Sequence, residues 1–139
     1  MGSLEELQEV ARSILSGIKP RKRGATVFAL SGDLGSGKTA FVKIAGKYFG
    51  IKETITSPTF LILKSYKLVA NSFKLLHHID AYRLEKGEEL MRLRFGELLN
   101  DPKNIIFIEW SEHVANVVPK YAKQISFLFI DELTRQIEV

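Results

Sequence analysis

The sequence contains no cysteine, and its stretches of consecutive apolar residues are short. The absence of cysteine excludes a disulfide framework, a thiolate nucleophile and a zinc site built on cysteine ligands. Apolar runs such as Ile105 to Ile108 are far shorter than the ~20 residues that a membrane-spanning helix needs. No signal-peptide pattern opens the chain. We therefore expect a cytoplasmic protein that does not contact a membrane.

The sequence also has no large excess of charge of either sign, because it contains 20 Lys and Arg residues and 16 Asp and Glu residues, a formal net charge of +4. Such a surplus permits an anionic partner but does not indicate one. The basic run Lys19 to Arg23 has no interleaved aromatic residue and no nucleic-acid-binding motif, so it favours a solvated loop over an RNA site. A chain of 139 residues with 45% hydrophobic residues is large enough for one core.

The apolar spacing predicts helices that alternate with strands. Helical spacing runs over residues 4–18, over residues 39–49 and from Met91 to Leu99. Predicted strands cover residues 26–31, 59–68, 73–80, 104–109, 124–131 and 135–139, with turns at 70–72 and 132–134. This order predicts an α/β fold: a mixed, mostly parallel sheet flanked by helices, with antiparallel hairpin additions.

One glycine-rich segment has the sequence of a phosphate-binding loop. Residues 32–39 read GDLGSGKT and match G-x-x-x-x-G-K-[ST] at every fixed position, between a predicted strand and a predicted helix. In such a loop, backbone N–H groups surround the phosphates, the lysine reaches the β- and γ-phosphate oxygens, and the hydroxyl ligates Mg²⁺. The candidate nucleotide ligands are Asp33, Leu34, Gly35, Ser36, Gly37, Lys38 and Thr39. We expect one P-loop NTPase domain over residues 1–139, in which an N-terminal helix and basic loop (1–24) precede the nucleotide-binding core (25–139).

A P-loop site needs a carboxylate for the metal ion or the attacking water, usually at the end of a neighbouring buried strand. Asp80 and Glu109 each end a predicted strand. With Lys38, they are the candidate catalytic residues. Successive side chains of a strand point to opposite faces, so we expect His78 on the same face as Asp80, and His77 with Ile79 on the other face. His78 is more often a hydrogen-bonded structural residue than a ligand or base in such a position.

Four sequence blocks together resemble the TsaE (YjeE) family. They are SGDLGSGKTAF at Ser31 to Phe41, SPTF at Ser57 to Phe60, HIDAYRL at His78 to Leu84, and EWSE at Glu109 to Glu112. The family comprises bacterial P-loop ATPases that work with TsaB and TsaD in making threonylcarbamoyladenosine in tRNA. The resemblance implies that Asp33 to Thr39 hold the phosphates of ATP, and that Thr39 and Glu109 hold Mg²⁺. It also implies that Asp80 lies near the γ-phosphate, Thr59 in a switch-like loop and Arg135 beside the nucleotide.

Three further residues are candidates for a switch or partner contact. Thr59 follows Pro58, which restricts Ser57 to extended geometry. Either the Thr59 hydroxyl approaches the metal, or this segment is only the entry to a strand. Trp110 is expected to point to the strand face opposite Glu109, where packing is its simplest role. Arg83 either balances nucleotide charge, binds a partner or is a solvated strand-end residue.

We therefore expect an ATP- and Mg²⁺-dependent hydrolase that acts on a TsaB–TsaD type assembly and reaches tRNA only indirectly. Such a protein would hydrolyse ATP slowly alone and faster with its partners. The sequence leaves open whether Asp80 or Glu109 orients the attacking water. Two alternatives also stay open: a small-molecule kinase that uses the same loop, and an interaction module that ATP stabilises and in which hydrolysis is incidental.

Overall fold

The computed structural model describes residues 4–33, 37–53, 55, 62–69, 71–131 and 134–139. Its helices are α1 (Leu4–Leu15), α2 (Lys38–Tyr48), α3 (Gly87–Met91), α4 (Phe95–Leu99) and the 3₁₀ helix η1 (Ser111–Val117). Its strands are β1 (Thr26–Gly32), β2 (Leu63–Lys67), β3 (Leu75–Asp80), β4 (Asn104–Glu109), β5 (Lys123–Asp131) and β6 (Thr134–Glu138). No helix within the described ranges is long and apolar enough to cross a bilayer.

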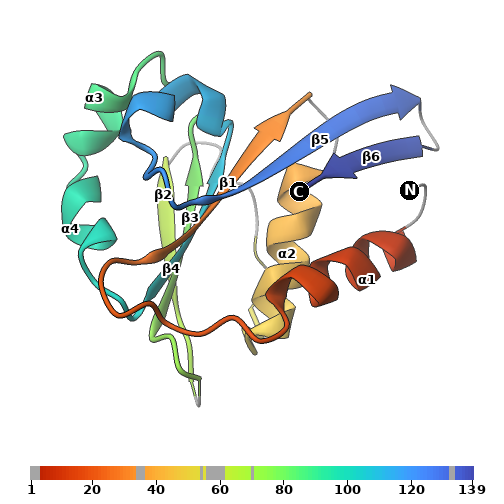
Figure 1. The fold of residues 1–139 in the computed structure, drawn as a ribbon, viewed down its shortest axis with the longest axis horizontal. Helices are drawn as coiled ribbons and strands as arrows, with labels where there is room; N and C mark the ends of the chain where they lie inside the picture. Colours follow the sequence, from red (N-terminus) through yellow and green to blue (C-terminus); the bar gives the residue numbers. More distant parts are fainter. Residues whose placement is uncertain (1–3, 34–36, 54, 56–61, 70, 132–133) are drawn as a thin grey trace.

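The strands form one six-stranded sheet in the order β2-β3-β4-β1-β5-β6. The four inner strands are parallel, whereas β2 pairs antiparallel with β3 and β6 pairs antiparallel with β5. The predicted fold class, a mostly parallel mixed sheet with hairpin additions, is therefore confirmed. Because β1 lies between β4 and β5, its carboxyl end lies near the middle of the sheet (Figure 1).

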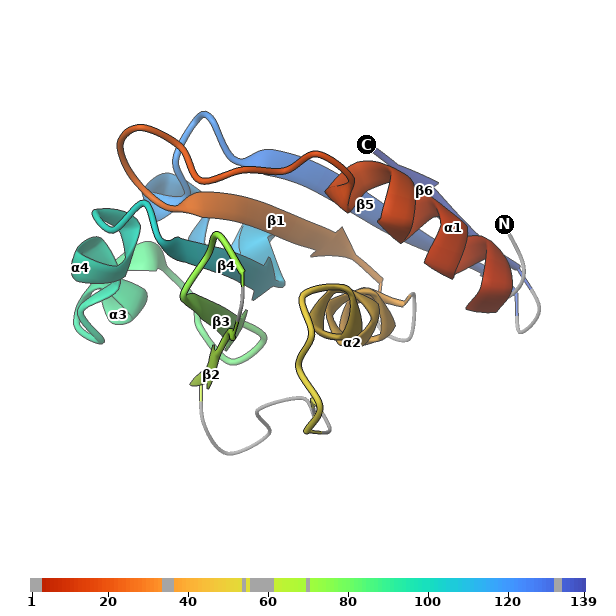
Figure 2. The same cartoon turned by 90° about the horizontal axis from the view of Figure 1, so that it is seen from below.

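The two faces of the sheet carry separate apolar layers, and helices cover both (Figures 1 and 2). Helices α1 and α2 cover a layer rich in phenylalanine, in which the Phe28 and Phe107 rings stack with centroids 5.0 Å apart. Phe41 of α2 contacts the rings of Phe107 and Phe127. Helices α3, α4 and η1 cover the second layer, which is mostly aliphatic. Full burial of one such large side chain is worth roughly 1.5–3 kcal/mol, so both layers hold the strand ends in place.

Two predicted helices differ from the structure. The single helix predicted from Met91 to Leu99 is wrong, because the segment forms α3 and α4 instead, and Arg94 between them has a φ angle of 66°. A non-glycine residue in this left-handed region interrupts an α-helix. The first helix ends at Leu15 rather than near residue 18, and Gly17, with φ 80°, begins the turn that follows. The 3₁₀ helix η1 has no counterpart in the prediction.

Candidate nucleotide-binding site

The phosphate-loop segment joins β1 to α2 and starts and ends with glycines in left-handed conformations. Gly32 has φ 127°, and a Cβ atom on it would lie 1.9 Å from the carbonyl oxygen of Phe127 on β5. Gly37 has φ 112° and precedes the first turn of α2. Only glycine adopts these angles at low cost, and only glycine fits against Phe127. The two glycines that the motif fixes are therefore required by the backbone. Leu34, Gly35 and Ser36 lie outside the described residues.

Lys38 is buried at the start of α2, where its ammonium group lies within the loop. Its Nζ atom donates hydrogen bonds to the carbonyl oxygens of Gly32, at 2.7 Å, and Asp33, at 2.8 Å. The Trp110 ring centroid lies 4.0 Å from the same nitrogen, within cation–π range. Burial lowers the pKa of Lys38, whereas four nearby carboxylates, led by that of Glu112, oppose the shift. The ammonium group of Lys38 is thus held against the first residues of the loop that the motif predicts to bind phosphate.

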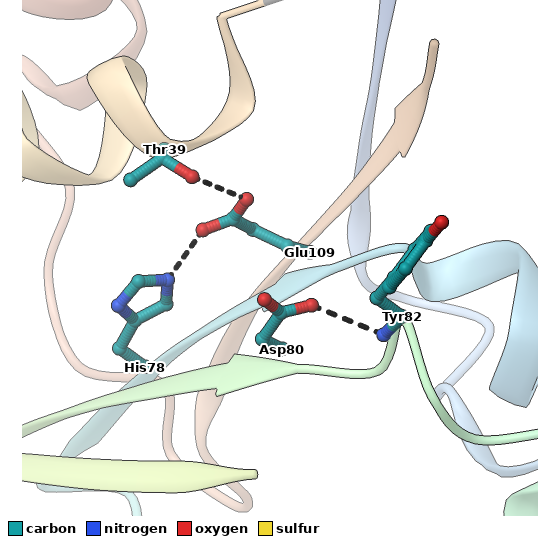
Figure 3. Close-up of polar contacts among 5 residues, drawn as sticks. All are labelled: Thr39, His78, Asp80, Tyr82 and Glu109. Atoms are coloured by element: carbon teal, nitrogen blue, oxygen red, sulfur yellow. Dashed lines mark hydrogen bonds and ion pairs between the residues drawn. The ribbon is translucent and has the colours of Figure 1, made fainter. Parts of the chain in front are cut away.

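A chain of hydrogen bonds connects α2 to the ends of β4 and β3 (Figure 3). The Thr39 hydroxyl donates to Oε1 of Glu109 at 2.7 Å. The other carboxylate oxygen, Oε2, lies 2.5 Å from Nε2 of His78. Glu109 and His78 are both almost fully buried, at 3% and 0% exposure. A buried carboxylate is costly without such partners, so His78 and Thr39 together fix the carboxylate of Glu109.

Asp80 lies beside Glu109, as the sequence predicted. The two residues are paired in the parallel register of β3 and β4, at the carboxyl ends of both strands. Oδ1 of Asp80 accepts a hydrogen bond from the backbone N–H of Tyr82 at 3.0 Å, which fixes the turn after β3 (Figure 3). Unlike Glu109, Asp80 is only partly buried. The structure thus brings Lys38, Thr39, Asp80 and Glu109 to one edge of the sheet.

The expected faces of the two adjacent histidines are confirmed. His78 points to the α2 side, where it contacts Glu109. Ile79 packs in the second layer, on the other side of the sheet. On that side, Nδ1 of His77 lies 2.7 Å from the Ser65 hydroxyl of β2, and burial lowers the pKa of His77. His78 therefore belongs to the site, and His77 joins two strands of the sheet.

Trp110 combines its predicted packing role with a contact that the sequence did not reveal. Its side chain packs against the second layer, on the face opposite Glu109, as expected. Its φ angle of 58° ends β4 and brings the ring over Lys38 as well. The rings of Tyr82 and His113 lie against it, with centroids 4.9 and 5.4 Å away. This aromatic cluster forms one wall beside the lysine, and Tyr82 in it is 52% exposed.

The remaining predicted residues are placed as follows. Arg83 is exposed in the turn after β3. The backbone of Arg135 pairs with Phe129 on the β5–β6 hairpin. Thr59 and the rest of the SPTF block lie outside the described residues. The roles of Arg83, Arg135 and Thr59 stay predictions.

Two residues of η1 that sequence analysis did not select hold this helix against the phosphate loop. Oε2 of Glu112 accepts the backbone N–H of Gly32 at 3.1 Å. The Ser111 hydroxyl donates to the carbonyl oxygen of Leu30 at 3.2 Å. Both contacts join residues about 80 positions apart in sequence. The one available signal was the EWSE block, which places Glu112 three residues after the strand-end Glu109.

The oxygen atoms of Thr39 and Glu109 fit a magnesium site. Mg²⁺ prefers hard oxygen ligands and is usually held by one or two protein groups together with water and substrate phosphates. A hydroxyl and a carboxylate within hydrogen-bond distance of each other, next to a phosphate loop, provide those groups. His78 acts behind them as the residue that orients the carboxylate. Among the described residues, no group of three or more His, Asp or Glu side chains is arranged to hold a metal on its own.

The chain matches the family model described as "Threonylcarbamoyl adenosine biosynthesis protein TsaE" over residues 1–137. It is 40% identical over 119 residues to the tRNA threonylcarbamoyladenosine biosynthesis protein TsaE of Rickettsia conorii, a match that covers 85% of this chain and 63% of the relative. The Rickettsia felis protein of the same name is 36% identical over 132 residues, covering 94% of this chain and 72% of that protein. The crystal structure of YdiB from Bacillus subtilis superposes with a TM-score of 0.72 at 24% identity, covering 99% of this chain and 79% of that one. With a family match over almost its whole length, this chain belongs to the TsaE family.

Proposed function

We propose that this protein binds ATP with Mg²⁺ at the β1–α2 loop and hydrolyses it during the biosynthesis of threonylcarbamoyladenosine in tRNA. The observation that carries the proposal is the contact between Thr39 and Glu109 beside the buried Lys38. This contact places a hydroxyl, a carboxylate and a cation around one point at the start of α2. A glycine-rich turn that binds no ligand does not require a hydroxyl, a carboxylate and a buried cation close together.

Each group has a separate task in this proposal. The backbone of the loop and Lys38 bind the phosphates, and Thr39 with Glu109 holds the metal ion. Bound Mg²⁺ would neutralise charge on the β- and γ-phosphate oxygens. Both oxygens of Glu109 are already engaged, by Thr39 and His78. Because Glu109 is assigned to the metal ion, we assign the orientation of the attacking water to Asp80, which lies next to Glu109 on β3.

The pathway assignment rests on the relatives, whose names place them in tRNA threonylcarbamoyladenosine biosynthesis. We propose that the chain acts there on an assembly of TsaB and TsaD homologues. Tyr82 and Arg83 are exposed immediately beyond Asp80, so a partner that docks on this turn would contact residues adjacent to the nucleotide. Such a partner can supply an arginine or order a loop, and a supplied arginine finger accelerates hydrolysis by roughly 10³–10⁵.

Isothermal titration calorimetry with ATP and Mg²⁺ tests nucleotide binding. Lys38→Ala should remove most of the ATP affinity, because it deletes the buried cation placed for the β- and γ-phosphates. Lys86→Ala is the matched control, since Lys86 is exposed just before α3, and it should bind ATP as the wild type does. Wild-type affinity in a folded Lys38→Ala protein would refute the assignment of the site.

Phosphate release, measured with and without the TsaB and TsaD homologues, separates the three functions that the loop permits. A hydrolase releases phosphate slowly alone and faster with the partners. A kinase transfers the phosphoryl group to an added acceptor instead of water. An interaction module binds the partners when ATP is present, but its hydrolysis rate does not change on binding. Equal rates for the isolated chain and the assembly would contradict activation by the partners.

A further inference from the structure

The amino-terminal edge of the sheet carries a row of basic residues that the proposed ATPase activity does not use. Because the inner strands are parallel, they all start at the edge opposite the nucleotide site. A basic residue stands shortly before the start of three inner strands, β1, β3 and β4, and another ends the antiparallel β2 at the same edge. These four residues, the basic edge, are Arg23, Lys74, Lys103 and Lys67, and all of them are exposed.

The register places two of these residues side by side. The backbone N–H of Lys74 donates to the carbonyl oxygen of Lys103 at 2.8 Å, which sets the two lysines at the same level of β3 and β4. The ladder between β1 and β4 begins at Thr26, opposite Ile105, and Arg23 lies three residues before it in the segment that enters β1. Adjacent strands are about 4.8 Å apart, so the backbones at Lys74 and Lys103 lie about 5 Å apart across the sheet.

The loop that contains the basic run contacts an aromatic residue from the segment before β5. The guanidinium of Arg21 lies 3.5 Å from the centroid of the Tyr121 ring, and the Tyr121 hydroxyl donates to the carbonyl oxygen of Ala25 at 2.9 Å. The run has no aromatic residue of its own, but the segment before β5 supplies one. The cations of the run are exposed, as expected for a solvated loop, and the loop contacts Tyr121 through the Arg21 side chain and the Ala25 backbone. A loop ordered in advance loses less conformational entropy when a ligand binds.

Within the described residues, no carboxylate neutralises the basic edge through a salt bridge. The ion pairs there are His78 with Glu109 and Arg94 with Glu97, and neither includes a residue of the basic edge. Asp101, in the turn before β4, accepts the backbone N–H of Lys103 at 2.9 Å. Carboxylates gather instead at the opposite edge, where Asp33, Asp80 and Glu109 follow or end their strands. Charge is therefore separated along the strand direction.

We propose that the basic edge binds the phosphate backbone of RNA, in the first place the tRNA of the modification pathway. Exposed cations at neighbouring strand starts suit a ligand with regularly repeated negative charge. A protein partner would be held mainly by a buried apolar and aromatic centre with few charges, whereas here a cation precedes each of three inner strands. The nucleotide site lies at the other edge, so ATP and RNA can be bound together. The proposal adds a direct RNA contact to a function for which only indirect contact was expected.

Fluorescence anisotropy with an unmodified transcript of a tRNA from the pathway tests the proposal. The edge variant replaces Arg23, Lys74 and Lys103 with Gln. The control variant makes the same change in charge elsewhere, at Arg12, Lys43 and Arg92, which are also exposed. At low salt, the edge variant should lose at least about tenfold in RNA affinity. A plot of the logarithm of RNA affinity against the logarithm of salt concentration has a negative slope. The slope of the edge variant should be less negative by about 0.7–0.9 for each phosphate that the variant no longer neutralises. The control variant should stay within about threefold of the wild type.

Three results would overturn the proposal. The first is wild-type protein that shows no salt-dependent binding of the transcript. The second is an equal loss of affinity in the edge and control variants, which would mean that overall charge and not this edge attracts RNA. The third is an edge variant that binds the transcript normally but no longer binds poly-glutamate, which would assign the edge to an acidic protein. ATP titration of the same variants keeps this test separate from the proposed ATPase function, because the edge variant should bind ATP like the wild type.

Discussion

At the scale of single residues, the proposed metal site depends on two oxygen atoms from distant parts of the chain. The Thr39 hydroxyl comes from the start of α2 and the Glu109 carboxylate from the end of β4, and they meet at 2.7 Å. Thr39→Ala and Glu109→Gln each change the oxygen ligands available to Mg²⁺, which requires near-octahedral coordination. Each should lower ATP affinity measured with Mg²⁺ by about tenfold or more, and change metal-free affinity less.

Magnesium titrations by calorimetry check this expectation. Thr26→Ala and Glu88→Gln serve as matched controls, because Thr26 lies at the opposite end of β1 and Glu88 is an exposed residue of α3. Both controls should keep the wild-type magnesium dependence. If Thr39→Ala and Glu109→Gln also keep it, the metal binds elsewhere.

Glu112 is the residue whose importance only the structure reveals. Its carboxylate accepts the N–H of Gly32, and its charge is the largest electrostatic influence on Lys38. An incoming γ-phosphate would therefore meet a negative charge beside the lysine. Glu112→Gln keeps an acceptor for Gly32 but removes the charge, so it should raise ATP affinity by roughly threefold to tenfold. The gain should be larger for ATP than for ADP and should shrink at high salt.

Two comparison variants make this prediction specific. Glu112→Ala removes both the charge and the acceptor, so it should gain less affinity than Glu112→Gln. Glu97→Gln removes an exposed carboxylate of α4 and should leave the ratio of ATP to ADP affinity unchanged. An unchanged ratio in Glu112→Gln as well would show that Glu112 only supports the loop structurally.

At the scale of elements, the sequence predicted well wherever a local pattern decides the structure. Periodicity located every strand core, and the P-loop motif located the glycines whose backbone angles it requires. Periodicity failed where the backbone angle of a single residue decides where a helix ends, as at Arg94 between α3 and α4. It also could not show contacts between distant segments. Glu109 with His78 and Glu112 with Gly32 join residues 31 and 80 positions apart, and no pattern in either segment encodes its partner.

The close approach of β1 to β5 at Gly32 yields a prediction for this pair of strands. A Cβ atom at Gly32 would lie 1.9 Å from the Phe127 carbonyl oxygen, and backbone atoms cannot move aside cheaply. Gly32→Ala should therefore lower the free energy of unfolding by about 3 kcal/mol or more. Gly17→Ala provides a matched control, since Gly17 also has a positive φ angle but a Cβ atom there would meet no other atom within 4 Å. It should cost only about 1 kcal/mol of backbone strain.

Urea denaturation of the two variants, followed by circular dichroism, measures the difference. The steric part of the effect is the excess cost of Gly32→Ala over Gly17→Ala. Equal costs would mean that β5 moves away from β1 without loss of stability, and the close approach would then not explain the fixed glycine.

At the scale of the whole molecule, the parallel sheet separates two kinds of surface. The carboxyl ends of the strands gather the carboxylates of the site around Lys38, and the amino ends carry the basic edge. Helices cover both faces of the sheet between them (Figure 2). Any coupling between ATP and a ligand at the basic edge must therefore pass along the strands or through these layers.

The stability of the whole sheet should depend on pH through His77, which is 2% exposed on β3. Burial lowers the pKa of His77 below the ordinary value of 6.5, so the folded protein binds this proton less readily than the unfolded chain. As the pH falls below 6.5, protons therefore favour unfolding, until the folded histidine is also protonated. One such group contributes a slope of up to about 1.4 kcal/mol per pH unit. Urea denaturation at pH 7.5 and pH 5.0 should show a smaller loss of stability in His77→Gln than in the wild type. Parallel pH profiles for the two proteins would show that the buried His77 ring takes up its proton as easily in the folded sheet as in the unfolded chain.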